Sequence, residues 1–216
     1  MPGLFITFEG TEGGGKSTQI ALLAERLRKL GHRVRVLREP GGTPIGEEIR
    51  HLLKHHPANE AMTPEAELLL MNASRAQLVL EVIRPALKAG EIVLCDRFYD
   101  STTAYQGHGR QLNLTLVKSV VDFAVGRTRP DLTLLLHVPP EVSEVRRRNR
   151  QARTTSPRDR FEEADRAFFR RVELGFAEIA QAEPKRVRKV DATKGIEAVH
   201  DDIWQLIAPH LSPAGN

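Results

Sequence analysis

The stretch L-F-I-T-F-E-G-T-E-G-G-G-K-S-T, residues 4–18, decides the fold. Its first five residues are mostly apolar and predict a strand, and residues 10–17 match the pattern G-x4-G-K-[ST] without a gap. Apolar residues at helical spacing follow over residues 17–30, and Gly31 is a good helix stop. The stretch therefore predicts strand, glycine-rich loop and helix, the context that a phosphate-binding loop (P-loop) requires.

The glycine-rich loop carries residues suited to a nucleoside triphosphate. Glycines allow backbone N–H groups to point inward around phosphate oxygens, and the start of a helix attracts the same anion. Lys16 supplies a mobile cation for the β- and γ-phosphates, and the Ser17 hydroxyl is a candidate Mg²⁺ ligand. We expect ATP to contact the whole loop, namely Gly10, Thr11, Glu12, Gly13, Gly14, Gly15, Lys16, Ser17 and Thr18.

Four further apolar runs alternate with helical patterns. The runs are residues 34–37, 92–95, 132–138 and 187–190, and the helical patterns cover residues 64–89, 114–125, 140–150, 162–182 and 196–211. Most runs are continuous rather than alternating, which is typical of strands covered on both faces and predicts an α/β fold with a parallel sheet. Pro85 should kink or divide the first of these helices. The length fits one domain over residues 1–211 with a frayed tail at 212–216.

The charge of the chain is concentrated in one segment. The net charge is +4, and residues 146–160 hold seven arginines against the single acid Asp159, so this segment carries +6 and the rest of the chain −2. A local positive field favours a phosphate site over a general polyanion surface. No apolar run is long enough to cross a membrane, the N-terminus does not resemble a signal peptide, and Cys95 is the single cysteine. We expect a cytoplasmic protein with no membrane partner.

Three polar clusters decide which reaction accompanies the P-loop, which GTPases, ATPases, helicases and kinases share. The first, R-E-P-G-G-T-P-I-G-E at residues 38–47, follows the second strand, and D-R-F-Y-D-S-T-T-A-Y-Q-G at residues 96–107 follows the third. N-A-S-R-A-Q at residues 72–77 lies on the long helix between them. Because ligands of such sheets bind at the carboxyl ends of the strands, we expect these clusters to meet in one cleft.

In combination, these motifs resemble those of bacterial thymidylate kinases. The resemblance covers about residues 4–208 and includes F-E-G-x-E-G-x-G-K-S-T, R-E-P-G-G-T, R-A-Q, D-R-F-x-x-S-T-x-A-Y-Q-G and a later D-R-F-E. It implies phosphorylation of dTMP to dTDP by ATP with Mg²⁺, a step toward dTTP, in a homodimer. It also implies a single nucleoside-monophosphate-kinase-like domain with a P-loop NTPase-type three-layer fold. The five parallel strands should have the order 2-3-1-4-5, with helices on both faces and a mobile lid at about residues 148–161.

The resemblance assigns roles to individual residues of the acceptor site. Arg97 is suited to grip the acceptor phosphate bidentately, although a surface ion pair is the alternative. Asp96 is a candidate partner of Mg²⁺, with a helix cap or a structural ion pair as the alternative. By resemblance, Glu12 faces the 3′-hydroxyl, Arg75 contacts the thymine edge and Tyr105 packs on the deoxyribose. The full acceptor set comprises Glu12, Glu39, Pro40, Met71, Arg75, Arg97, Ser101, Thr102, Tyr105 and Gln106.

The arginine-rich segment supplies the remaining candidates. Gly14 bears no side chain where one family subtype has a catalytic arginine, which implies the other subtype, in which lid arginines supply this charge. Arg153, Arg158 and Arg160 are therefore expected to contact ATP, and Arg153 and Arg158 are expected to join Lys16, Arg97 and Glu12 in catalysis. A solvated basic face is the alternative. A nucleic-acid arm is disfavoured, because no aromatic residues interleave the arginines.

Rival functions stay open at this stage. Met71 stands where the family often has an aromatic residue stacked on thymine, which keeps a kinase for another monophosphate, such as dUMP or dGMP, as an alternative. A P-loop ATPase that acts on nucleic acid is a second alternative, but it leaves the residues of 96–107 without a role. A pure binding module is the third.

Overall fold

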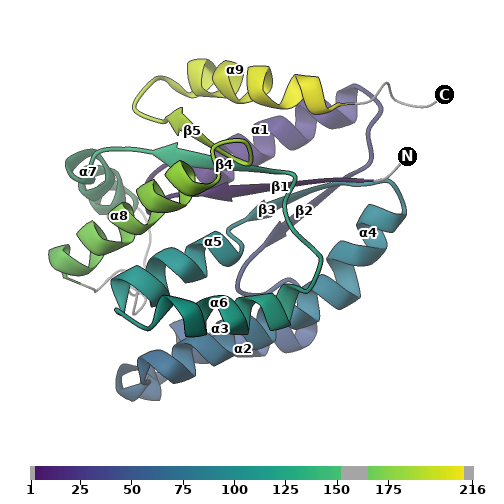
Figure 1. The fold of residues 1–216 in the computed structure, drawn as a ribbon. Helices are drawn as coiled ribbons and strands as arrows, with labels where there is room; N and C mark the ends of the chain where they lie inside the picture. Colours follow the sequence, from purple (N-terminus) through teal and green to yellow (C-terminus); the bar gives the residue numbers. More distant parts are fainter. Residues whose placement is uncertain (1–2, 152–164, 212–216) are drawn as a thin grey trace.

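The computed structural model describes residues 3–151 and 165–211. Within them, β1 (Leu4–Glu9), β2 (Val34–Arg38), β3 (Ile92–Asp96), β4 (Leu132–His137) and β5 (Val187–Asp191) form one sheet (Figure 1). All neighbouring strands are parallel, and their order is β2-β3-β1-β4-β5. The predicted fold class and strand order are confirmed.

Helices cover both faces of the sheet, which explains why the central strands are apolar on both sides. The helices α1 (Lys16–Lys29) and α9 (Ile196–Ile207) lie on one face, where Ile6 and Phe8 of β1 point. On the other face, Phe5 packs with α3 (Pro64–Leu78) and α6 (Leu114–Val125), and α8 (Arg166–Ala182) packs against β4. None of the described helices has both the length and the apolarity that crossing a bilayer requires.

The long predicted helix of residues 64–89 is divided, as its proline indicated. The helix α3 continues through a π-helical turn, Val79–Ile83, into α4 (Arg84–Lys88). The π turn ends at Ile83, shortly before Pro85, which has no N–H to donate to the preceding turn. The predicted C-terminal helix is α9 followed by a 3-10 turn, Ala208–His210, and residues 140–150 form most of α7 (Pro140–Gln151).

Two helices are absent from the prediction. The helix α2 (Pro44–Lys54) begins at Thr43, whose side chain accepts a hydrogen bond from Gly46 N at 3.0 Å, and Pro44 occupies the first turn. The helix α5 (Tyr99–Thr102) continues as a π-helical segment, Thr103–Gly109. Each begins after a short connection that follows β2 or β3, so the polar clusters of residues 38–47 and 96–107 lie partly on helices rather than in loops.

Candidate active site at the carboxyl edge of the sheet

The P-loop connects β1 to α1 through a backbone that glycine makes possible. Gly10, Gly13 and Gly15 have positive φ angles of 124°, 79° and 83°. A Cβ at Gly10 would lie 2.3 Å from the carbonyl oxygen of Leu136 on β4, so this position also tolerates no side chain. Gly15 caps α1 without a side-chain hydrogen bond. The loop therefore presents the positive end of a helix and a run of backbone N–H groups to one point in space.

Lys16 folds back over the loop. Its Nζ donates to the carbonyl oxygens of Gly10 at 3.1 Å and Thr11 at 3.0 Å, and its side chain is buried. Burial, together with the neighbouring Arg97 guanidinium, lowers the pKa of Lys16 to about 8. The P-loop lies next to the end of β3 because β1 and β3 are paired, and Lys16 is therefore in the electrostatic field of Arg97.

The two predicted metal ligands lie together. The Ser17 hydroxyl, at the start of α1, donates to Oδ2 of Asp96, the last residue of β3, at 3.0 Å. Hydroxyl and carboxylate oxygens are ligands that Mg²⁺ accepts. Among the described residues, no three His, Cys, Asp or Glu side chains gather as an all-protein metal site would need. The pair therefore fits a Mg²⁺ ion that takes its other ligands from phosphates and water.

Arg97 adopts a backbone conformation that is rare for a residue with a side chain. Its φ is 69°, and its N–H donates to the Phe8 carbonyl at 2.9 Å. Its guanidinium donates to Ser101 Oγ at 2.9 Å and to the Tyr105 hydroxyl at 3.3 Å. Such strain persists where the surroundings hold the residue firmly, and it is common at functional sites.

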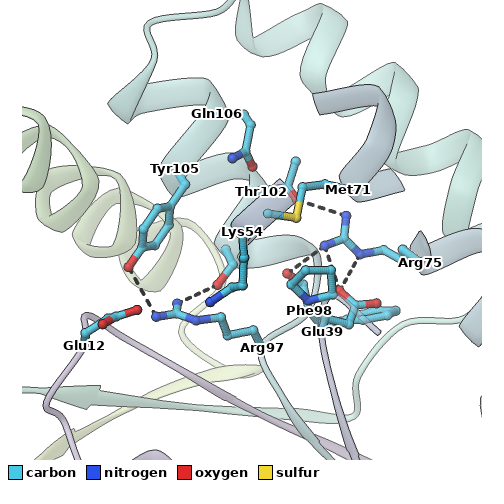
Figure 2. A pocket seen from close by; sticks show the side chains of 12 residues that line it. Glu12, Glu39, Lys54, Met71, Arg75, Arg97, Phe98, Thr102, Tyr105 and Gln106 are labelled. Atoms are coloured by element: carbon cyan, nitrogen blue, oxygen red, sulfur yellow. Dashed lines mark hydrogen bonds and ion pairs between the residues drawn. The ribbon is translucent and has the colours of Figure 1, made fainter. Parts of the chain in front are cut away.

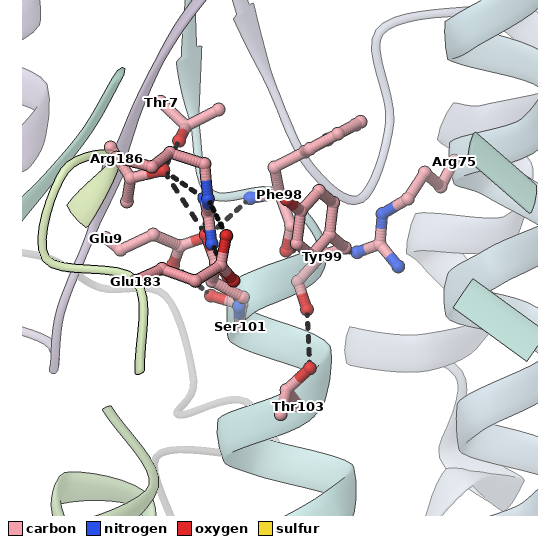
Figure 3. Close-up of polar contacts among 11 residues, drawn as sticks. Thr7, Glu9, Arg75, Phe98, Tyr99, Ser101, Thr103, Glu183 and Arg186 are labelled. Atoms are coloured by element: carbon pink, nitrogen blue, oxygen red, sulfur yellow. Dashed lines mark hydrogen bonds and ion pairs between the residues drawn. The ribbon is translucent and has the colours of Figure 1, made fainter. Parts of the chain in front are cut away.

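Glu9, which the sequence reasoning did not single out, holds the segment after Arg97. Its fully buried carboxylate accepts hydrogen bonds from Phe98 N at 2.7 Å, Ser101 N at 3.2 Å and Ser101 Oγ at 2.5 Å (Figure 3). Burial and the nearby Asp100 carboxylate raise the pKa of Glu9. An acid at the end of an apolar strand was the available signal, but nothing nearby in the sequence indicates its partners.

All ten residues expected to bind the acceptor line one pocket beside the P-loop (Figure 2). Lys54 from the end of α2 and Phe98 complete its lining. Phe98 is fully buried and also belongs to the core, where its ring meets Phe5 at 5.0 Å between centroids. The three polar clusters thus meet in one cleft, as expected from the ends of parallel strands.

Arg75 forms the floor of this pocket and is almost fully buried. It forms an ion pair with Glu39 at 2.7 Å, and it also donates to Asn72 Oδ1, Thr102 Oγ1 and the Phe98 carbonyl at 2.9, 2.9 and 3.2 Å. These contacts engage every nitrogen of the guanidinium, so a hydrogen bond from Arg75 to a base requires the exchange or sharing of one contact. Oε1 of the buried Glu39 has no hydrogen-bond partner within the described part of the chain, and burial raises the pKa of this carboxyl against the opposing effect of Arg75.

The opposite wall of the pocket is built from the π-helical segment. Tyr105 packs against Phe168 and Phe176 of α8, with ring centroids 6.0 and 6.2 Å apart, and burial raises the pKa of its hydroxyl. Gln106 donates to the buried Glu67 carboxylate at 2.8 Å, which fixes its amide. Met71 is half-buried beside this group. Arg153, Arg158 and Arg160, the expected lid arginines, lie outside the described residues, as does the tail of residues 212–216.

The arrangement defines a P-loop phosphotransferase with a pocket for a second substrate. The donor loop and the acceptor pocket meet at Glu12, a residue of the P-loop that lines the pocket together with Arg97. A hydrolytic P-loop switch has no need of a second pocket with buried and specific polar groups. The fold and the site therefore favour a kinase.

Comparison with known proteins identifies the family. A family model described as thymidylate kinase matches residues 8–203. Thymidylate kinase of Syntrophotalea carbinolica is 50% identical over 212 residues, 98% of each chain, and that of Deinococcus radiodurans is 49% identical over 95% of this chain and 97% of its own. The crystal structure of thymidylate kinase from Ehrlichia chaffeensis matches with a TM-score of 0.76 at 32% identity, over 96% of this chain and 99% of that one. The chain belongs to the thymidylate kinase family.

Proposed function

We propose that this chain, as a thymidylate kinase, binds ATP at the P-loop and dTMP in the acceptor pocket. It transfers the γ-phosphoryl group of ATP to dTMP and yields ADP and dTDP. The observation that carries the proposal is that the donor loop reaches the acceptor pocket, because Glu12 of the P-loop lines the pocket together with Arg97. Donor and acceptor phosphates repel each other, so phosphoryl transfer depends on positioning and on neutralising charge between them.

The P-loop holds the donor. Its backbone N–H groups bind the phosphates of ATP, and Lys16 exchanges its contacts with the loop carbonyls for the β- and γ-phosphates. Ser17 and Asp96 would hold Mg²⁺, directly or through its water, and the ion would neutralise charge on the phosphates. Arg153, Arg158 and Arg160 supply further positive charge to ATP, and Arg153 and Arg158 assist the transfer.

The acceptor pocket orients dTMP. Arg97 grips its phosphate, with Ser101 and Tyr105 fixing the guanidinium, while Glu12 faces the 3′-hydroxyl and the Tyr105 ring excludes a 2′-hydroxyl. Glu39 and Arg75 lie at the end of the acceptor pocket where the thymine base binds. A donor from the pyrimidine edge would relieve the cost of the unpartnered Glu39 oxygen.

We also propose that the chain acts as a homodimer in the cytoplasm. Large apolar side chains on α3, the π turn and α6 are exposed, and α3 and α6 lie side by side (Figure 1). Phe123 on α6 is 91% exposed and Leu80 on the π turn 61%. A second copy would bury this apolar surface. Light scattering after gel filtration should give twice the chain mass, and Phe123→Asp should shift it to the monomer. A monomer at micromolar concentration of the unaltered protein would reject the proposal.

The function is tested by ADP release with ATP and Mg²⁺ against dTMP, dUMP, dGMP, AMP and UMP. We expect the highest kcat/KM with dTMP, near-complete loss of kcat in Lys16→Met, and no stimulation by nucleic acid. Stronger turnover with another monophosphate would transfer the assignment to that acceptor. ADP release that needs no acceptor would overturn the two-substrate mechanism.

A further inference from the structure

Gln106 lines the acceptor pocket with an amide whose orientation a second residue fixes. In Figure 2 the side chain extends from the π-helical segment toward the space beside Thr102 and Met71, and its oxygen is the tip nearer the middle of the pocket. Its Nε2 donates to Oε1 of Glu67 on α3 at 2.8 Å. Gln106 is 1% exposed and Glu67 0%, so this contact lies inside the wall of the pocket, where water does not compete for the amide.

Glu67 can contact the amide of Gln106 in only one way. It also pairs with Arg110, whose Nη2 lies 3.0 Å from Oε2 and whose Nε lies 3.3 Å from Oε1 of Glu67. The Arg110 guanidinium in turn lies over the Phe168 ring of α8, 4.8 Å from its centroid. A carboxylate in an ion pair accepts hydrogen bonds and donates none. The NH2 group of Gln106 must therefore face Glu67, which leaves the amide oxygen for the pocket.

An amide oxygen at this place distinguishes pyrimidine bases by their hydrogen-bonding edge. Thymine and uracil carry an N–H at position 3, which donates, whereas cytosine has an unprotonated nitrogen there, which accepts. The oxygen attracts the first and repels the second, and two buried acceptors that face each other are costly. Thr102 extends the pattern, because its oxygen already accepts from Arg75 at 2.9 Å and its O–H can donate to a carbonyl oxygen of the base.

We propose that Glu67 is a positioning residue for base specificity, which holds the amide of Gln106 so that the pocket accepts the N3–H of thymine or uracil and rejects cytosine. Glu67 lies behind the residues that line the pocket and acts through Gln106. The proposal rests on the function proposed above, because it concerns the nucleoside monophosphate that this pocket binds.

The test replaces Glu67 by glutamine, which keeps the shape of the side chain and adds a donor. The new amide should keep its oxygen toward Arg110 and turn its NH2 group toward Gln106, whose own amide then rotates and presents NH2 to the base. The values of kcat/KM are measured with dUMP and dCMP, which differ only at positions 3 and 4 of the base. We expect the preference for dUMP over dCMP to fall at least about tenfold in Glu67→Gln, the size expected for one hydrogen bond, with a rise in kcat/KM for dCMP itself.

The matched control is Glu81→Gln, because Glu81 also accepts from a glutamine amide, that of Gln77 at 2.7 Å, but at an exposed position outside the pocket. It should leave the preference unchanged. Thermal unfolding checks that Glu67→Gln folds. If it does not, Glu67→Gln/Arg110→Met, which removes both charges of the pair, replaces it and should show the same fall in preference.

An unchanged preference in a folded variant would overturn the proposal. An equal fall of kcat/KM for dUMP and dCMP would also overturn it, since a residue that only supports the wall of the pocket would affect both nucleotides alike. Phosphorylation of dTMP by the unaltered protein tests the underlying function separately.

Discussion

Removal of the Arg186 side chain should destabilise the protein strongly, although this residue lies outside the pocket. Arg186 precedes β5, and its guanidinium contacts both carboxylate oxygens of Asp100 on α5, at 2.7 and 2.8 Å. It also donates to Thr133 Oγ1 at 2.7 Å and pairs with Glu183 at 2.8 Å. The side chains of Arg186 and Asp100 are 11% and 3% exposed, so the pair is buried.

The expected cost follows from the charge that the variant Arg186→Met leaves behind. Removing one member of a buried ion pair costs about 3–5 kcal/mol, because the partner stays buried without compensation. We expect the lower end, about 3 kcal/mol, since Thr133 still donates to Asp100 at 3.3 Å. The lost contact with Glu183, which is 51% exposed, adds little. Urea unfolding at pH 7.5, followed by circular dichroism, measures the difference in the free energy of unfolding.

A double variant separates this explanation from a loss of packing. In Arg186→Met/Asp100→Asn neither charge of the pair is left, so we expect about half of the lost stability to return. Asp100 precedes Ser101, which contacts both Glu9 and Arg97, so the single variant should also raise KM for dTMP. A loss below about 1 kcal/mol in Arg186→Met, or a double variant no more stable than the single one, would refute the reasoning.

Three further predictions follow from the site. Burial and Asp100 raise the pKa of Glu9 to about 7 from an ordinary 4.5. Between these pH values the native state therefore binds more protons than the unfolded state. The free energy of unfolding should consequently fall as pH rises from 5 to 7. Urea unfolding of Glu9→Gln at both pH values should show a smaller fall. Gly10→Ala should abolish ATP binding in calorimetry, because its Cβ would lie 2.3 Å from the Leu136 carbonyl; affinity within twofold of the unaltered protein would contradict this. Arg97→Lys loses the bidentate fork and should raise KM for dTMP at least about tenfold, whereas an unchanged KM would place the phosphate elsewhere.

The donor site could be predicted from residues alone, because its elements are consecutive. A strand, a glycine-rich loop and a helix within residues 4–30 contain both the backbone conformation and the charges that bind phosphate. The sheet was equally accessible, since continuous apolar runs between helical patterns predict parallel strands. Its strand order came from the family resemblance, because periodicity does not say which strands are neighbours.

The acceptor pocket depends on contacts between residues far apart in the sequence, so local sequence patterns could not predict it. The Arg186–Asp100 pair joins residues 86 positions apart, and Glu9 meets Ser101 across 92. The family resemblance assigned ten residues to the acceptor site, but it did not indicate the contacts that hold them in place. The helix α5 was also missed, because Y-D-S-T has no apolar periodicity and is held in place by Glu9 from another element.

Arg75 and Lys54 show why a basic residue on a helix has no role that its sequence position can reveal. Both lie in the last turn of a helix, where a cation complements the helix dipole and usually faces water. The contact of α2 with α3 and the position of β3 turn both side chains toward the same cavity instead. There they diverge, because Arg75 lies opposite the buried acid Glu39 and forms an ion pair with it, whereas Lys54 stays half-buried in the lining of the pocket. The neighbouring elements, rather than the helix that carries each residue, decide that both side chains line the acceptor pocket.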